Sequence, residues 1–105
     1  MSRKLDEAIA ENLGIDINHA GVITPYYSTD GNAMLELDRE MRQKRYWLDK
    51  VSRIEIDEFI QYQVVYWKYQ DDPNVQAFNC AEADTMPEAI ALASYRALTG
   101  KEFKE

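Results

Sequence analysis

The sequence predicts an α+β domain in which three antiparallel strands are packed with helices as a layered sandwich. Apolar residues recur at helical spacing towards both ends of the chain, and aromatic and β-branched residues concentrate within residues 59–69. The chain has 105 residues, 46% of them hydrophobic, which is enough to bury a core without disulfides or metal ions. We therefore expect a single domain over residues 1–105, with the element order α-α-β-β-β-α.

A first helix is predicted over residues 2–13. Leu5, Ala8, Ile9 and Leu13 form an apolar stripe at helical spacing. Ser2 is the expected N-cap, and Gly14 supplies the stop. An irregular connector then runs to residue 27, because Pro25 disfavours helical backbone in the residue before it.

A second helix is predicted from Ser28 to about Lys44. Ser28 is the expected N-cap, and Asp30 then lies in the first turn, where a negative charge suits the positive helix end. The expected buried seam consists of Met34, Leu35, Leu37 and Met41.

Three strands should follow, within residues 46–54, 59–69 and 75–83. The middle strand is apolar on both faces, which indicates that both faces are covered. Helices on both sides would explain this pattern, and so would a second subunit on one side. One face carries Ile60, Tyr62, Val64 and Tyr66, and the other carries Phe59, Val65, Trp67 and Tyr69.

The last helix is predicted to begin at Thr85 and to end at Gly100. Thr85 and Glu88 have the spacing of a capping box, and Pro87 is tolerated in the first turn. The many alanines of this segment favour close packing against the sheet. The expected buried face consists of Met86, Ala89, Ile90, Ala93, Ala97 and Leu98.

Charge is distributed unevenly over a chain whose net charge is −7. Residues 39–53 hold six basic and two acidic residues, a net +4, whereas the remainder holds six basic and seventeen acidic residues, a net −11. One interpretation is a helix face with ion pairs such as Asp38–Arg42. The other is a basic patch that binds nucleic acid weakly, which the overall charge makes unlikely for the chain as a whole.

The residues needed for catalysis or metal binding are nearly missing from the sequence. His19 is the only histidine and Cys80 the only cysteine, so a zinc site of the usual kind cannot be assembled. Residues 16–27 lack the ligands of a calcium loop, and Asp71 and Asp72 stand in a turn before Pro73. We therefore expect no enzyme activity, no catalytic residue, no metal and no cofactor, with Cys80 as a buried structural thiol.

The surplus of aromatic residues has two interpretations. One is packing in the core and on the faces of the sheet, and the other is an interaction surface, because aromatic side chains anchor protein interfaces. The middle strand has more large apolar side chains than a three-stranded sheet hides easily. The candidate surface residues are Trp47, Tyr62, Tyr66, Trp67 and Tyr69, together with Arg42 and Arg45.

Two short motifs resemble those of the phage ABA sandwich domain family. Residues 25–30 read PYYSTD and residues 83–90 read ADTMPEAI, and each motif opens a predicted helix on either side of the three strands. The resemblance implies a phage or prophage origin and an α/β/α sandwich. It implies no activity, since both motifs are explained as helix caps. Residues 91–95 depart from the alanine pattern common in that family.

These observations together predict an accessory protein of phage origin that works by binding, as a homodimer and with a host or phage protein. Alternatives are an acidic inhibitor of a host DNA-binding enzyme, a nucleic-acid binder that uses residues 39–53, and a small enzyme that uses carboxylates alone. The bacterial cytoplasm is the expected location, since no apolar run reaches about 18 residues.

Overall fold

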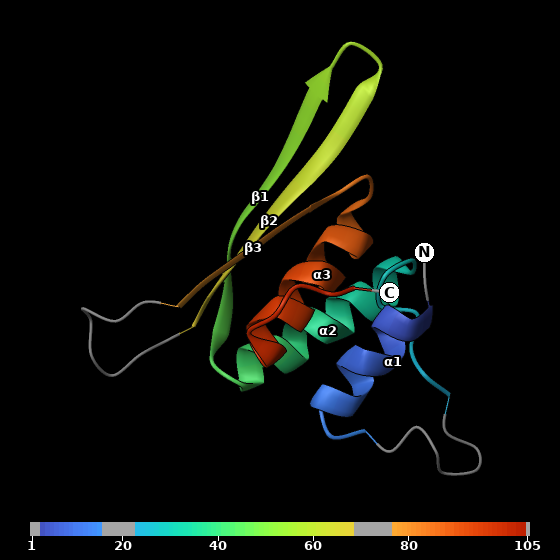
Figure 1. Cartoon of the computed structure of the whole chain (residues 1–105), viewed down its shortest axis with the longest axis vertical. Helices are drawn as coiled ribbons and strands as arrows, with labels where there is room; N and C mark the ends of the chain where they lie inside the picture. Colours follow the sequence, from blue (N-terminus) through green and yellow to red (C-terminus); the bar gives the residue numbers. More distant parts are fainter. Residues whose placement is uncertain (1–2, 16–22, 69–76, 105) are drawn as a thin grey trace.

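The computed structural model describes residues 3–15, 23–68 and 77–104 (Figure 1). Ser2, His19, Tyr69 and the Asp71–Asp72 pair, all considered above, lie outside the described residues, as does most of the calcium-loop segment. The predicted element order is confirmed. The elements are α1 (Arg3–Asn12), α2 (Gly31–Gln43), β1 (Tyr46–Ile56), β2 (Phe59–Lys68), β3 (Ala77–Ala83) and α3 (Met86–Thr99).

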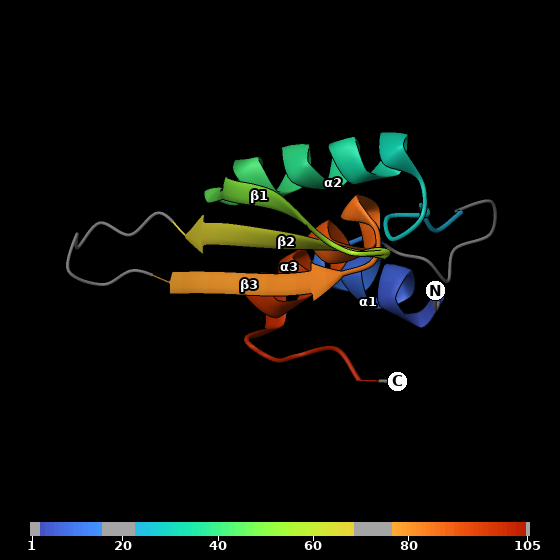
Figure 2. The same cartoon turned by 90° about the horizontal axis from the view of Figure 1, so that it is seen from above.

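The three described strands form one antiparallel sheet in the order β1-β2-β3 (Figure 2). A bulge between Leu48 and Lys50 interrupts the pairing of β1 with β2. The α+β class and the antiparallel sheet are as predicted, but the layers are not in an α/β/α order. All three helices lie on one side of the sheet (Figure 1), because α2 and α3 pack against its strands and against each other, and α1 packs on α3.

Helix α3 is buried on several sides, between the sheet and the other two helices. Its residues Ala89, Ala91, Ala93 and Ser94 are all buried, and their small side chains let the neighbouring elements approach closely. The predicted packing of alanines against the sheet is thus confirmed. Ala91 and Ser94 extend the buried face beyond the predicted set, because this helix has no fully solvated side.

Both ends of α3 follow the sequence prediction. The Thr85 hydroxyl accepts a hydrogen bond from the Glu88 backbone N–H at 3.4 Å, and Pro87 stands in the first turn. Gly100 ends the helix with φ 75°, a left-handed conformation that glycine adopts without a steric penalty.

The start of α2 differs from the prediction. Asp30 is the N-cap, and its carboxylate accepts from the N–H groups of Asn32 and Ala33 at 3.4 and 3.3 Å. Ser28 is buried two residues earlier, where its backbone N–H donates to Asp6 at 2.9 Å. Ser28 thus makes a tertiary bond to α1 before the helix begins, and the cap falls on Asp30 instead.

The apolar seam of α2 is confirmed at three of its four predicted positions. Met34, Leu37 and Met41 are buried, and their i, i+3, i+7 spacing keeps them on the face towards the core. Leu35 was placed in the seam wrongly, since it is 59% exposed. It lies about 100° around the helix from Met34 and so points away from the core.

Asp6 joins α1 to the segment before α2 through a small polar cluster. Its carboxylate is 1% exposed and accepts from the Arg3 guanidinium at 2.7 Å and from the Ser28 N–H. Arg3 also donates to the carbonyl oxygens of Thr24 and Pro25, and it stacks over the Tyr26 ring at 3.7 Å. A buried carboxylate with charged and neutral donors is stabilising only while those donors remain.

Asp6→Ala is expected to lower the free energy of unfolding by roughly 2–3 kcal/mol, since it removes charge-assisted hydrogen bonds and leaves the Ser28 N–H without its acceptor. Urea unfolding followed by circular dichroism measures the change. The matched control is Glu7→Ala on the exposed side of α1, where a loss below about 0.5 kcal/mol is expected. Equal losses in the two variants would contradict a structural role for Asp6.

Candidate interaction surface

The sheet has an inner face towards the helices and an outer face that no described helix covers (Figure 1). Cross-strand pairing and the alternation of side chains assign the residues to the two faces. The pairing places two charged positions of the described strands on the outer face, Lys50 opposite Val65 and Glu82 opposite Gln63, and Gln63 donates to Glu82 at 2.6 Å. The outer-face set comprises Trp47, Lys50, Ser52, Ile54, Phe59, Gln61, Gln63, Val65, Trp67, Cys80 and Glu82.

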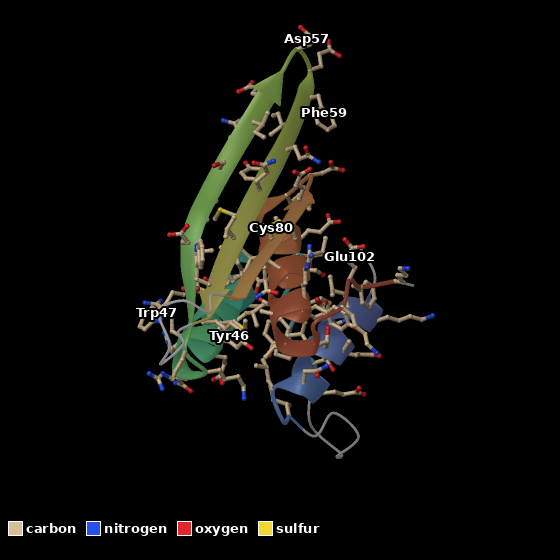
Figure 3. All side chains as sticks on the ribbon, turned by 60° about the vertical axis from the view of Figure 1, so that its left-hand side comes forward. Tyr46, Trp47, Asp57, Phe59, Cys80 and Glu102 are labelled. Atoms are coloured by element: carbon tan, nitrogen blue, oxygen red, sulfur yellow. The ribbon has the colours of Figure 1, made fainter. Side chains whose placement is uncertain are left out.

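Trp47 and Trp67 pair directly across β1 and β2 on this outer face. Residues opposite each other in an antiparallel pair have Cβ atoms about 4.5–5.5 Å apart, so the two indoles are neighbours. Trp47 is 51% exposed and points away from the helices (Figure 3), whereas the adjacent Tyr46 turns inwards and donates its hydroxyl to the Ala97 carbonyl at 3.0 Å. The two tryptophans of the predicted surface therefore do lie together.

The two tyrosines of the predicted surface do not join them. Tyr66 is fully buried on the inner face, and Tyr62 is partly buried against the same core. Tyr69 lies outside the described residues. The prediction failed for Tyr62 and Tyr66 because both faces of this strand are apolar, so the sequence does not indicate which face the helices cover.

Tyr66 anchors a polar cluster beneath the sheet. Its hydroxyl donates to Asp38 on α2 at 2.9 Å, and the other oxygen of Asp38 pairs with Arg42 at 3.0 Å. Burial, reinforced by the Asp38 carboxylate, raises the pKa of Tyr66 well above its ordinary value. The predicted Asp38–Arg42 pair is present within α2, and the Tyr66 hydroxyl joins Asp38 to the sheet.

The basic segment of residues 39–53 is divided between the end of α2 and β1. Arg53 lies 3.8 Å from Glu55, and Arg42 is engaged by Asp38. Arg45 is exposed at the turn between the two elements, where its φ of 70° is left-handed. Lys44 and Arg45 are close to Trp47 in sequence. The carboxylates of Asp38 and Glu55, on either side of the segment, offset part of its positive charge.

Cys80 was predicted to be a buried thiol, and this is wrong. It is exposed, because it lies on the uncovered outer face and because β3 is the last strand of the described sheet. Figure 3 shows its position on the face away from α3.

The two motifs that carry the family resemblance meet in space. Ser28 and Thr29 from the first motif and Thr85, Pro87 and Glu88 from the second line one hollow of about 390 Å³. Burial, with a contribution from Asp84, raises the pKa of Glu88. Thr85 already accepts the Glu88 N–H, so the hollow brings together two helix starts rather than a nucleophile with a base.

Within residues 3–15, 23–68 and 77–104, no three His, Cys, Asp or Glu side chains are grouped so that they hold a metal ion. In the same part of the chain, none of the helices has both the length and the apolar character needed to cross a lipid bilayer.

Comparison with known protein families, with curated proteins and with solved structures finds no match to this chain. The resemblance to the phage ABA sandwich domain family thus stays a prediction made from two motifs.

Alkaline pH is expected to destabilise the protein through its buried tyrosines. Burial, together with Glu40, raises the pKa of Tyr27 to about 12, and the pKa of Tyr66 is raised as well. The fold favours the neutral phenols, so this stability is complete below pH 10 and is lost as the pH rises towards the folded-state pKa. Each tyrosine then lowers the free energy of unfolding by about 1.4 kcal/mol per pH unit.

Tyr66→Phe removes one of these titrations and separates the two contributions. At pH 7 the variant should lose roughly 1–2 kcal/mol, because Asp38 loses a hydrogen bond. Between pH 10 and 12 the free energy of unfolding of the variant should fall less steeply than that of the native chain. The two slopes should differ by about 1.4 kcal/mol per pH unit, the contribution of the Tyr66 titration. Urea titrations at several pH values measure both effects, and identical slopes would rule out the assignment to Tyr66.

Proposed function

We propose that this protein is a non-enzymatic, self-associating module of phage or prophage origin, and that two copies pack through the outer faces of their sheets. The observation that supports the proposal most directly is the one-sided cover of the sheet. It leaves the half-exposed Trp47 and Phe59 on a face where the described strands place two charged positions, Lys50 and Glu82. Aromatic residues on a surface depleted of charge are typical of the centre of a protein interface.

A second copy is the occupant that fits this face. Two chains of net charge −7 repel each other wherever their acidic surfaces meet, so they associate best through a surface that carries little charge. The outer face has one acidic and one basic position among the described strands, Glu82 and Lys50, so it adds no net negative charge to the contact. Two sheets that pack face to face lie about 10 Å apart and interdigitate their side chains, which would bury the exposed half of Trp47.

The rival functions have less support from the geometry. A nucleic-acid binder needs several free cations on one surface, whereas Arg42 and Arg53 are next to carboxylates and the whole chain is acidic. An acidic inhibitor of a DNA-binding enzyme needs its carboxylates gathered in a row that imitates phosphates. Asp6, Asp30 and Asp38 are instead used inside the fold, as anchors and as a cap.

The proposal predicts a concentration-dependent mass that Trp47 controls. Sedimentation velocity of the native chain at 1–200 μM should show a monomer that converts to a dimer. Trp47→Ser should weaken the dimer roughly thirtyfold in Kd, the effect of losing an interface hot spot of about 2 kcal/mol.

Leu35→Ser is the matched control, because Leu35 is a similarly exposed apolar residue on α2 and not on the outer face. This variant should dimerise like the native chain. A native chain that stays monomeric over the whole concentration range would refute self-association. Equal weakening by both variants would refute the outer face as the contact.

A further inference from the structure

We infer that the free edge of β3 is a second contact between copies of this chain, at which two β3 strands pair antiparallel and join two three-stranded sheets into one of six strands. This inference rests on the edge of the sheet, not on the outer face used in the proposed function. Each contact is a two-fold one, and the two lie on different surfaces of the molecule.

The two edges of the described sheet are not equivalent. β1, at one edge, carries Asp49, Lys50, Arg53 and Glu55 and contains the bulge, and both charges and bulges protect an edge from pairing. β3, at the other edge, has the sequence AFNCAEA, with one charged residue and no proline. It therefore keeps a row of backbone groups available to another strand.

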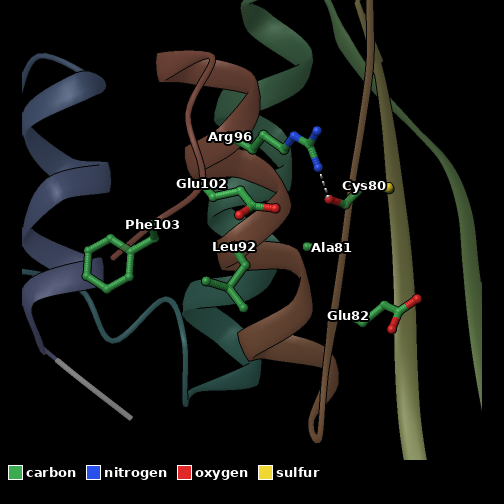
Figure 4. Close-up of a pocket in the computed structure, with 7 residues that line it drawn as sticks. All are labelled: Cys80, Ala81, Glu82, Leu92, Arg96, Glu102 and Phe103. Carbon is green, nitrogen blue, oxygen red and sulfur yellow. Dashed lines mark hydrogen bonds between the residues drawn. The ribbon is translucent and has the colours of Figure 1, made fainter. Parts of the chain in front are cut away.

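Arg96 shows which groups of β3 face outwards. Its guanidinium, on α3, donates to the Cys80 carbonyl oxygen at 3.3 Å, and Figure 4 shows that oxygen turned towards Arg96 and not towards β2. Backbone groups alternate in direction along a strand, so those of Phe78, Cys80 and Glu82 point away from β2. Arg96 occupies one of these acceptors, as a neighbouring strand would.

The sequence of β3 suits pairing with itself. In an antiparallel pair centred on Cys80, all seven residues of each strand overlap, and Glu82 of one copy lies opposite Phe78 of the other. Glu82 of one chain therefore does not lie opposite Glu82 of the other, an arrangement in which two like charges would destabilise the pair. Arg96 also places a positive charge beside the edge, next to Glu82 and Glu102.

Space for the incoming strand lies next to β3. A hollow of about 200 Å³ opens between β3, α3 and the C-terminal segment, with Leu92 and Phe103 in its wall (Figure 4). An edge-to-face contact with Tyr95, at 5.3 Å between ring centroids, holds Phe103 in place. The helix-facing side of a second β3 would bring Asn79, Ala81 and Ala83, whose small side chains suit a hollow of this size.

The only cysteine of the chain reports on this pairing. Directly opposite residues that exchange backbone hydrogen bonds have Cα atoms about 5.5 Å apart, within the range that a disulfide spans. The test is the rate of dimer cross-linking at 20 μM by oxidised glutathione, which accepts two electrons and releases two reduced glutathione molecules for each disulfide formed. Non-reducing gels measure the product.

The native chain should cross-link at least tenfold faster than the random-collision control Cys80→Ser/Glu11→Cys, which carries its one thiol at an exposed site on α1. Arg96→Ala should accelerate the native reaction, because it frees the Cys80 carbonyl. Glu82→Pro should slow it to the control rate, because proline removes an outward N–H that an edge strand does not need for its own sheet. Circular dichroism and thermal unfolding verify that each variant folds.

Trp47→Ser separates this inference from the proposed function. Fast cross-linking that survives Trp47→Ser and is lost in Glu82→Pro supports the β3 edge, even if the outer-face contact fails its own test. Fast cross-linking that is lost in Trp47→Ser and survives Glu82→Pro would show that facing sheets bring the two Cys80 residues together. That result, or a native rate equal to the control rate, would overturn the edge pairing.

Discussion

The packing of α3 is the constraint on which the other elements depend. A helix that touches two strands and two helices must present small side chains in several directions, and Ala89, Ala91, Ala93 and Ser94 do so. Because α3 lies directly on β2 and β3, α1 is separated from the sheet and packs on α3 instead. The three helices therefore lie on one side of the sheet, and the other side contacts solvent or a partner.

Two carboxylates, the buried Asp6 and the partly buried Asp38, fix the remaining elements to this centre. Asp6 binds the chain ahead of α2 through Ser28, and Asp38 binds α2 to the sheet through Tyr66. In each case an arginine on the same helix, Arg3 or Arg42, supplies the compensating charge. The acidic character of the chain is thus partly structural, and a carboxylate that anchors a helix is not free to recognise a partner.

The surfaces that remain differ in what they offer. The outer face offers exposed aromatic area, and the β3 edge offers backbone groups beside the Arg96 guanidinium. Apolar area and backbone hydrogen bonds are the two ordinary means by which sheets associate. The bulge and the charges of β1 protect the other edge of the sheet from pairing with a second copy. The geometry therefore limits how copies of this chain assemble.

The sequence by itself determined the elements, their order and the capping of α3, because these depend on periodicity and on neighbours within one turn. The Asp38–Arg42 pair belongs to the same group, since its partners stand one helical turn apart. The exposed surface depended instead on which side of the sheet the helices chose. Tyr66 and Trp67 are adjacent and both aromatic, yet only the position of α2 and α3 makes one a core residue and the other part of a surface. Tertiary contacts likewise moved the cap of α2 from Ser28 to Asp30 and left Cys80 at an open edge, since long-range packing decides burial and leaves no local signal in the sequence.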